Sequence, residues 1–234
     1  MIKGLYLCGT VHLDLAGPER LRKVLDTVKP DCVAVESYPA LSQEILEKRK
    51  EIVEMTEQTL LQRLKDKSKV PIDGVRTDSA LALLNCAGYE IWVPHEYADK
   101  TGAQIAHIED EGRSKRISNG FLENILSDPK KTEPFIEMLK LSPKTLRNIF
   151  DFCYELGAQR DNDICEVAER NKVFAERISQ LDGRVLAVTG AGHIYGAEPT
   201  LQTLLKGYNP TSFKLAQADY FDSDKRNRIT LTEQ

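Results

Sequence analysis

The sequence lacks the features that several classes of protein need. Its 234 residues carry no basic surplus, because 32 Lys and Arg stand against 36 Asp and Glu, so we do not expect a nucleic-acid binder. No apolar run approaches the roughly 18 residues of a membrane span, and the amino terminus leads directly into an expected strand rather than into a signal peptide. The five cysteines contain no Cys-x-x-Cys pair, which excludes a zinc-finger or disulfide scaffold and favours reduced thiols in a cytoplasmic protein.

Short apolar runs alternate with amphipathic stretches along the chain. Such unbroken runs are typical of parallel strands that are buried on both faces, and a helix between the first two runs indicates a right-handed βαβ unit. The sequence therefore predicts an α/β fold with a central, mostly parallel sheet flanked by helices. The expected strands are 5–8, 32–35, 89–93, 104–108, 184–189 and 212–218, and the expected helices include 17–30, 41–67, 77–87 and 192–206.

The second half of the chain carries a long helical pattern that prolines and a glycine interrupt. We interpret residues 113–182 as a helical insert within a single domain that spans residues 1–218, because the strand that follows is expected to join the first sheet. Residues 219–234 have the composition of a polar tail.

Three candidate site residues each follow an expected strand. His12 ends the segment Gly9-Thr10-Val11-His12, Glu36 ends the second strand, and His193 ends Gly190-Ala191-Gly192-His193. Open α/β sheets place their sites at the carboxyl ends of parallel strands, so these side chains are expected to converge. Two imidazoles and a carboxylate can bind a divalent metal or act as general acid and base. The candidate oxyanion donors in the two turns are the amides of Gly9, Thr10, Gly190 and Gly192.

Each of these residues alone also has an ordinary structural explanation, such as a hydrogen-bonded loop histidine or an edge carboxylate. Their shared position favours function. His95 and His107 lack the glycine context, so we expect His107 to be structural, and His95 is a weak metal candidate.

A polar residue interrupts the apolar stripe of a helix that ends near residue 181. Asn171 stands where that stripe should continue, so its amide needs buried partners. Arg170 beside it either pairs with Glu166 on a solvated face, or clamps an anion or orients Glu36.

Taken together, these segments resemble the TraB/PrgY/GumN family, which is related to the Tiki proteases, ChaN and the erythromycin esterases. The resemblance extends from about residue 5 to residue 205. Its motifs are Gly9-Thr10-Val11-His12, Lys29-Pro30-Asp31 before Val33-Ala34-Val35-Glu36, Glu169-Arg170-Asn171, and Val188-Thr189-Gly190-Ala191-Gly192-His193.

The resemblance implies an α/β fold with metal-dependent peptide cleavage, as in some relatives, or ester hydrolysis, as in others. By position, the site roles fall on His12, Glu36, Arg170 and His193, with Asp14 and Asn171 behind them. The chain departs from the family pattern at Asn171, where Asp is common, and its nearest match to an Asp-Arg element is Glu109-Asp110 with Arg113 or Arg116 downstream. It also shows no carboxyl-terminal membrane segment.

The sequence thus predicts a metal-dependent hydrolase of a small peptide or ester substrate, with Mn, Zn or Co bound by His12, Glu36 and His193. In a metal-free version one histidine is the general base and Glu36 sets its tautomer. Two other readings stay open: a non-catalytic peptide- or ligand-binding protein of the same fold, and nucleotide binding through Gly190-x-Gly192-x-x-x-Gly196, with Asp219 ending the next strand. No nucleic-acid partner is expected, and assembly into a homo-oligomer is left open.

Overall fold

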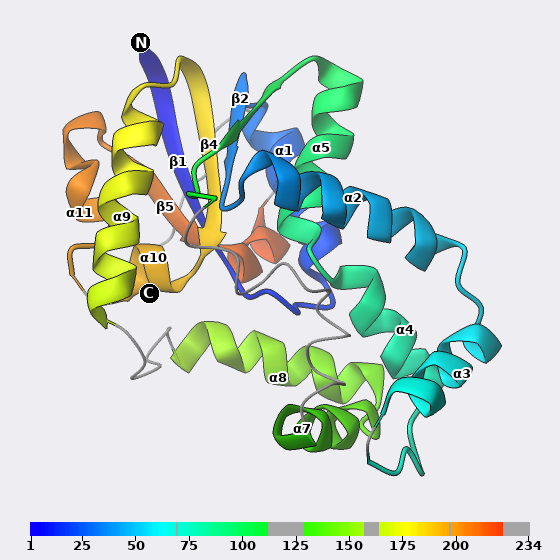
Figure 1. Cartoon of the computed structure of the whole chain (residues 1–234). Helices are drawn as coiled ribbons and strands as arrows, with labels where there is room; N and C mark the ends of the chain where they lie inside the picture. Colours follow the sequence, from blue (N-terminus) through cyan, green and yellow to red (C-terminus); the bar gives the residue numbers. More distant parts are fainter. Residues whose placement is uncertain (69, 112–128, 157–163, 197, 222–234) are drawn as a thin grey trace.

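The computed structural model describes residues 1–68, 70–111, 129–156, 164–196 and 198–221. Five parallel strands form one sheet in the order β3-β2-β4-β1-β5, which confirms the predicted α/β fold (Figure 1). The strands are β1 (Ile2–Thr10), β2 (Cys32–Val35), β3 (Gln104–His107), β4 (Gly183–Gly190) and β5 (Thr211–Lys214).

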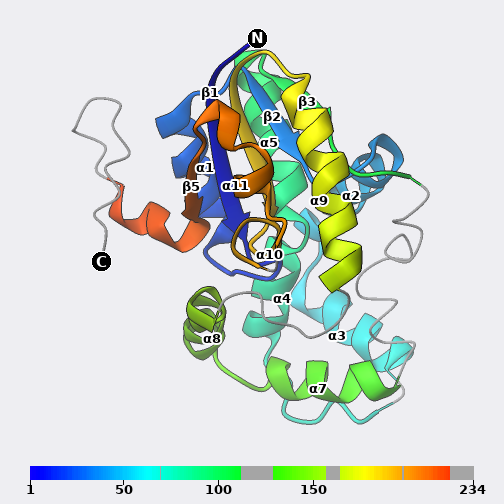
Figure 2. The same ribbon diagram turned by 90° about the vertical axis from the view of Figure 1, so that its left-hand side faces the viewer.

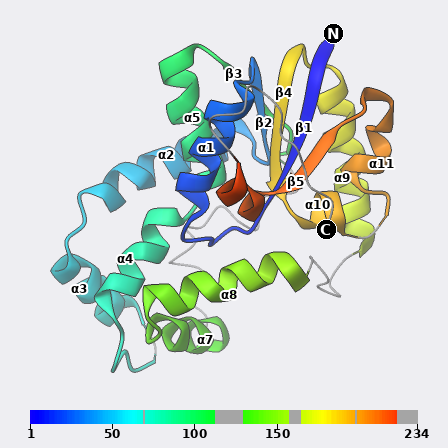
Figure 3. The ribbon, with the colours of Figure 1, turned by 180° about the vertical axis from the view of Figure 1, so that it is seen from behind.

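Helices cover both faces of the sheet and also gather beyond its carboxyl edge. On one face lie α1 (Gly17–Val28) and α5 (Tyr89–Thr101), and on the other lie α9 (Ile164–Ser179), α10 (Gly192–Tyr195) and α11 (Leu201–Leu204) (Figure 2). Beyond the carboxyl ends of the strands lie α3 (Glu57–Lys67), α4 (Thr77–Cys86), α7 (Pro129–Leu139) and α8 (Pro143–Leu156), as Figures 1 and 3 show. Helix α2 (Pro39–Val53) and the 3₁₀ segments η2 (Lys206–Tyr208) and η3 (Leu215–Tyr220) complete the described elements. None of the helices in these described ranges is long and apolar enough to cross a membrane.

The strands contribute side chains to two separate cores. Val33 and Val35 of β2 point into the core with α1 and α5, whereas Ala34 between them points into the core with α9. All four residues of β2 are buried. A strand that is covered on both faces needs apolar residues at every position, which explains the unbroken runs in the sequence.

The prediction of a strand at 89–93 is wrong, because these residues form the first turns of α5. Tyr89, Trp92 and Val93 are almost completely buried and follow the i, i+3, i+4 spacing of a helix face. A short run that is apolar throughout does not distinguish a buried strand from a buried helix. Gly88, immediately before the helix, has φ +66°. This left-handed conformation turns the chain between α4 and α5, and glycine adopts it without strain.

Three other expected elements differ in their extent. The single helix expected at 41–67 is two helices, α2 and α3, because Thr56 caps the amino terminus of α3 with a side-chain hydrogen bond to Thr59. The helix expected at 192–206 is divided into α10, α11 and η2, and the strand expected at 212–218 ends at Lys214 and continues as η3. Within the described part of the helical region 113–181 lie α7, α8 and α9; residues 112–128 and 157–163 fall outside the described residues.

Candidate active site

Strand order brings the three candidate segments together. Strand β4 lies between β1 and β2, with Gly190 in register with Thr10 and Val188 in register with Val35. The chain leaves β1 towards α1 on one face and leaves β4 towards α10 on the other. Adjacent strands whose connections diverge in this way open a crevice at their carboxyl ends, which is the usual place of a site in an open α/β sheet.

The carboxylate of Glu36 is the centre of this cluster. Its Oε2 accepts a hydrogen bond of 2.8 Å from the Gly190 amide, while Oε1 lies 2.5 Å from Nη2 of Arg170 and 3.2 Å from Nε2 of His193. Burial alone would raise the pKa of Glu36, but the charges of His193, Arg170 and His12 outweigh it and hold the pKa well below its ordinary value. Glu36 is therefore ionised at neutral pH.

The hydrogen bonds of Asn171 define the tautomer of His193. The Asn171 amide nitrogen donates to the Pro199 carbonyl over 2.8 Å, so its oxygen faces Nδ1 of His193, 2.6 Å away. An amide oxygen only accepts, and Nδ1 therefore carries a proton. The His193 Nε2 atom then faces Glu36 with a lone pair, unless a proton or another cation lies between them. Asn171 is completely buried, and its inward amide thus has the partners that the sequence required.

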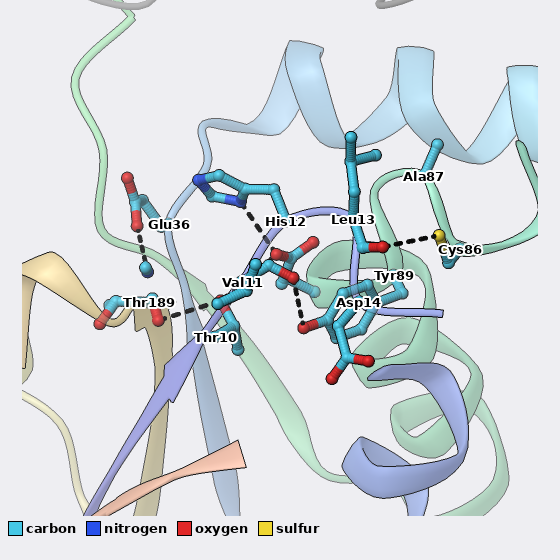
Figure 4. A network of polar contacts seen from close by, with 12 residues as sticks. Thr10, Val11, His12, Leu13, Asp14, Glu36, Cys86, Ala87, Tyr89 and Thr189 are labelled. Carbon is cyan, nitrogen blue, oxygen red and sulfur yellow. Dashed lines mark hydrogen bonds and ion pairs between the residues drawn. The ribbon is translucent and has the colours of Figure 1, made fainter. Parts of the chain in front are cut away.

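His12 lies on the loop after β1, and its ring projects towards Glu36 (Figure 4). Its Nδ1 is 2.9 Å from Oε1 of Glu90, and Nε2 is left without a protein partner among the described residues. The Glu90 carboxylate raises the pKa of His12 to about 9, although 73% of the side chain is exposed and water screens this attraction. Nε2 of His12 and Oε2 of Glu36 each lie 3.7 Å from the point that a Cβ on Gly190 would occupy. A side chain at position 190 would therefore contact both polar atoms.

Arg170 connects Glu36 to a second carboxylate. Its Nε and Nη2 donate to the Oε2 atom of Glu109, which is almost completely buried, and the same Nη2 contacts Glu36. The sequence left three roles open for Arg170: pairing with Glu166, binding an anion, or orienting Glu36. These contacts fit the third role. Arg177, two turns further along α9, donates to the Glu109 carbonyl and to the Asp110 carboxylate. Arg113 and Arg116 lie outside the described residues.

Asp14 does not contact the three central residues. Its carboxylate is completely buried and accepts hydrogen bonds from Arg20, from the hydroxyl of Tyr154 and from the Ala16 amide. The Tyr154 hydroxyl also accepts a hydrogen bond from the Val11 amide. Asp14 therefore fixes the loop that carries His12 and does not touch the imidazole itself.

The four candidate oxyanion residues make other contacts in the structure. The Gly190 amide is already bonded to Glu36. A Cβ on Gly9 would come within 3.1 Å of Ala191 and 3.3 Å of the Tyr195 ring, so close packing of β1 against α10 requires this glycine. The Thr10 hydroxyl lies 3.1 Å from the Thr189 carbonyl and 3.3 Å from Glu90. Gly192 begins α10, which has only four residues.

The same observations weigh against the dinucleotide interpretation. A helix of four residues offers little dipole to a pyrophosphate. Asp219 lies in η3 rather than at a strand end, and its carboxylate is bonded to Arg20.

The rings of His95 and His107 lie beside one another. Their ring centroids are 6.1 Å apart, and Nδ1 of His107 lies 3.3 Å from the Ser42 hydroxyl. Burial lowers the pKa of both rings.

The sequence analysis did not place Glu90 in the site, and it named Glu109 only as part of the nearest match to the family's Asp-Arg element. Glu90 lies in the run that was interpreted as a strand, where its side chain had no defined direction. Glu109 follows β3 at the sheet edge, and the available signal was its place after an expected strand, the same signal that marks Glu36. Within the described ranges no group of three or more His, Cys, Asp or Glu side chains has the arrangement of a formed metal site.

Comparison of the chain with protein-family models, with curated proteins and with solved structures finds no match. The site must therefore be interpreted from its own geometry and from the order of its motifs.

Replacement of Arg170 by lysine tests whether the planar guanidinium is needed between Glu36 and Glu109. Lysine keeps the charge but presents one nitrogen, so we expect the free energy of unfolding to fall by about 1–3 kcal/mol. Urea denaturation measures this loss. Lys172→Arg on the same helix, in an exposed pair with Glu169, is the control and should change little. Equal stability of the Arg170→Lys protein and the wild type would contradict the role of the guanidinium.

Proposed function

We propose that the chain is a hydrolase of a peptide or ester bond that works with a divalent metal ion bound by His12, Glu36 and His193. The observation that carries this proposal is the common orientation of the two histidines. Each Nδ1 is bonded to an oxygen acceptor, Glu90 for His12 and Asn171 for His193. Metal-binding histidines characteristically bond one ring nitrogen in this way and leave the other for the ion.

Three contacts support this assignment. Nε2 of His193 faces a carboxylate oxygen of Glu36 at 3.2 Å, a contact that either a proton on Nε2 or a bound metal ion satisfies. Nε2 of His12 and the same carboxylate each lie 3.7 Å from the position of a Cβ on Gly190. Two imidazoles and one carboxylate suit Zn, Mn or Co. The order of the motifs along the chain, which resembles that of the TraB/PrgY/GumN family, supports the same assignment.

A bound ion of this kind would polarise a carbonyl and lower the pKa of a water molecule. The chain's own residues do the rest. Arg170 holds Glu36 from one side and the Gly190 amide holds it from the other, so the carboxylate keeps one orientation. Asn171 fixes the ring of His193 through Nδ1. His12 is the most exposed of the three, and substrate would therefore approach the cluster from the side of this residue.

The proposal is tested by adding Mn²⁺, Zn²⁺ or Co²⁺ to the purified, chelator-treated protein and measuring its melting temperature and its hydrolysis of model peptides and esters. An ion at 100 times its Kd should stabilise the protein by about 2.7 kcal/mol. His12→Ala and His193→Gln should each remove both the stabilisation and the hydrolysis, whereas His95→Gln should retain them. Activity that resists chelators and is lost in the same two variants would contradict the metal and favour direct acid–base catalysis. Ligand-induced stabilisation without any turnover would instead favour a binding protein.

A further inference from the structure

Glu90 is a buried carboxylate that contacts His12 and is not one of the three proposed metal ligands. It is 8% exposed and lies in the first turn of α5. Its Oε1 atom lies 2.9 Å from Nδ1 of His12 and 3.3 Å from the hydroxyl of Thr10. Burial of a carboxylate is costly unless donors surround it. These two donors both belong to the segment Gly9-Thr10-Val11-His12.

The position of Glu90 is rigidly defined. A Cβ on Gly88, immediately before α5, would come within 2.8 Å of Ile45, so this turn packs closely against α2. Tyr89 is completely buried, and its hydroxyl donates to the Val11 carbonyl over 3.2 Å. Figure 4 shows Tyr89 beneath the loop that carries His12. Two successive residues of one helical turn therefore hold this loop. Tyr89 contacts its backbone at Val11, and Glu90 contacts the imidazole of His12.

The chemistry of the contact determines which nitrogen of His12 is protonated. An ionised carboxylate only accepts hydrogen bonds, so Nδ1 of His12 must be the donor. Once the ring has lost its second proton, the lone pair is on Nε2, which lies 3.7 Å from the position of a Cβ on Gly190. Glu90 lies in the first turn of α5, and the first turn of a helix favours a negative charge.

The contact has a counterpart on the opposite face of the sheet. Asn171 on α9 fixes Nδ1 of His193, whereas Glu90 on α5 fixes Nδ1 of His12. The helix α9 packs in one core and α5 in the other, so the two imidazoles are oriented by separate supports.

We propose that Glu90 is a positioning residue for His12: by accepting a hydrogen bond from Nδ1–H, Glu90 directs the Nε2 lone pair of the neutral imidazole towards Glu36. The role that this orientation serves, ion binding, rests on the proposed function.

The test compares Glu90→Ala, which removes the acceptor, with Glu90→Gln, which keeps the size and an amide oxygen. Glu96→Ala is the control, because Glu96 lies on the same helix in an exposed ion pair with Arg22. The first measurement is the imidazole ¹⁵N chemical shifts at a pH where the rings are neutral. The chain has four histidines, so His12→Ala assigns the resonances of His12. The second measurement is the affinity for Mn²⁺, Zn²⁺ and Co²⁺ by calorimetry.

In the wild type and in Glu96→Ala, His12 should be protonated at Nδ1. In Glu90→Ala it should shift to the Nε2–H form that an unrestrained histidine prefers in water, with Glu90→Gln intermediate. Ion affinity should fall about 10- to 100-fold in Glu90→Ala, less in Glu90→Gln, and not at all in Glu96→Ala. If Glu90→Ala does not fold, Glu90→Gln supplies the comparison.

The two proposals fail separately. Wild-type nitrogen shifts in both Glu90 variants would overturn the positioning role, whatever the ion affinity. A changed tautomer in a protein that binds no ion and hydrolyses nothing would leave Glu90 as the positioning residue and overturn the metal-dependent hydrolase.

Discussion

Replacement of Arg20 by methionine should reduce the free energy of unfolding by about 3–5 kcal/mol, the usual cost of removing one partner from a buried ion cluster. The guanidinium of Arg20 is 4% exposed and faces three carboxylates. Nη1 donates to Asp14 over 2.9 Å and to Asp151 over 2.7 Å, while Nε and Nη2 donate to Asp219. Methionine would leave Asp14, which is completely buried, without its counter-charge.

These contacts connect segments that lie far apart in the sequence. Arg20 belongs to α1, Asp151 to α8 and Asp219 to η3, and Figure 3 shows α1, α8 and η3 on the same side of the molecule. Asp14 belongs to the loop that carries His12. The loss of Arg20 should therefore also loosen this loop, and ion binding by the variant should weaken together with its stability.

Urea denaturation of the wild type and the variant measures the loss, and its pH dependence identifies the cause. Hydrogen bonds from Arg20 hold the pKa of Asp219 below its ordinary value of 3.8. A group whose pKa is depressed in the folded protein stabilises it above the ordinary pKa, and this contribution disappears as the pH falls through the depressed value. The difference between the two proteins should therefore shrink in acid.

Lys23→Met is the matched control, since Lys23 lies on the same helix and contacts the backbone carbonyl of Asp219 at the surface. Lys23→Met should lower the free energy of unfolding by less than about 1 kcal/mol. An equal cost for the two substitutions would contradict a buried ion cluster at Arg20.

The parts of the fold that follow from local pattern were predictable, and the parts that follow from packing were not. Apolar runs located β2 and β4, because a strand covered on both faces consists mainly of apolar residues, and they also located β1 and the edge strand β3. The place of β4 between β1 and β2 depends on how distant segments pack, and no residue in those strands encodes it locally. The convergence of His12, Glu36 and His193 depends on that order.

Asp14 and Glu90 show the same distinction within the site. Asp14 is two residues from His12 in the sequence and was expected behind the site residues. The turn after Val11 instead directs its carboxylate to Arg20, on the other side of the loop. Glu90 is 78 residues away and contacts the imidazole directly. Only the packing of α5 against the loop brings Glu90 and His12 together. The apolar run from Tyr89 to Val93 was predicted as a strand, so this helix was not expected there.

Replacement of Gly190 by alanine should abolish ion binding in a protein that still folds. The added Cβ would lie 3.7 Å from Nε2 of His12 and from Oε2 of Glu36, distances of ordinary van der Waals contact, so the backbone has no reason to move. The φ of Gly190 is not in the left-handed region, and alanine therefore adds no strain there. The methyl group would nevertheless contact both atoms and hinder the approach of an ion to them.

We therefore expect the affinity of the Gly190→Ala protein for Mn²⁺, Zn²⁺ and Co²⁺ to fall roughly 100-fold or more, which corresponds to about 2.7 kcal/mol of binding free energy. Hydrolysis should be lost in parallel, while the unfolding free energy without ions should change by less than about 1 kcal/mol. Gly4→Ala is the matched control, because Gly4 lies in β1 near the opposite end of the sheet and its Cβ would also meet only ordinary contacts, the nearest at 3.6 Å. Calorimetric titration compares the three proteins. Wild-type affinity in the Gly190→Ala protein would contradict joint binding of an ion by His12 and Glu36 beside residue 190.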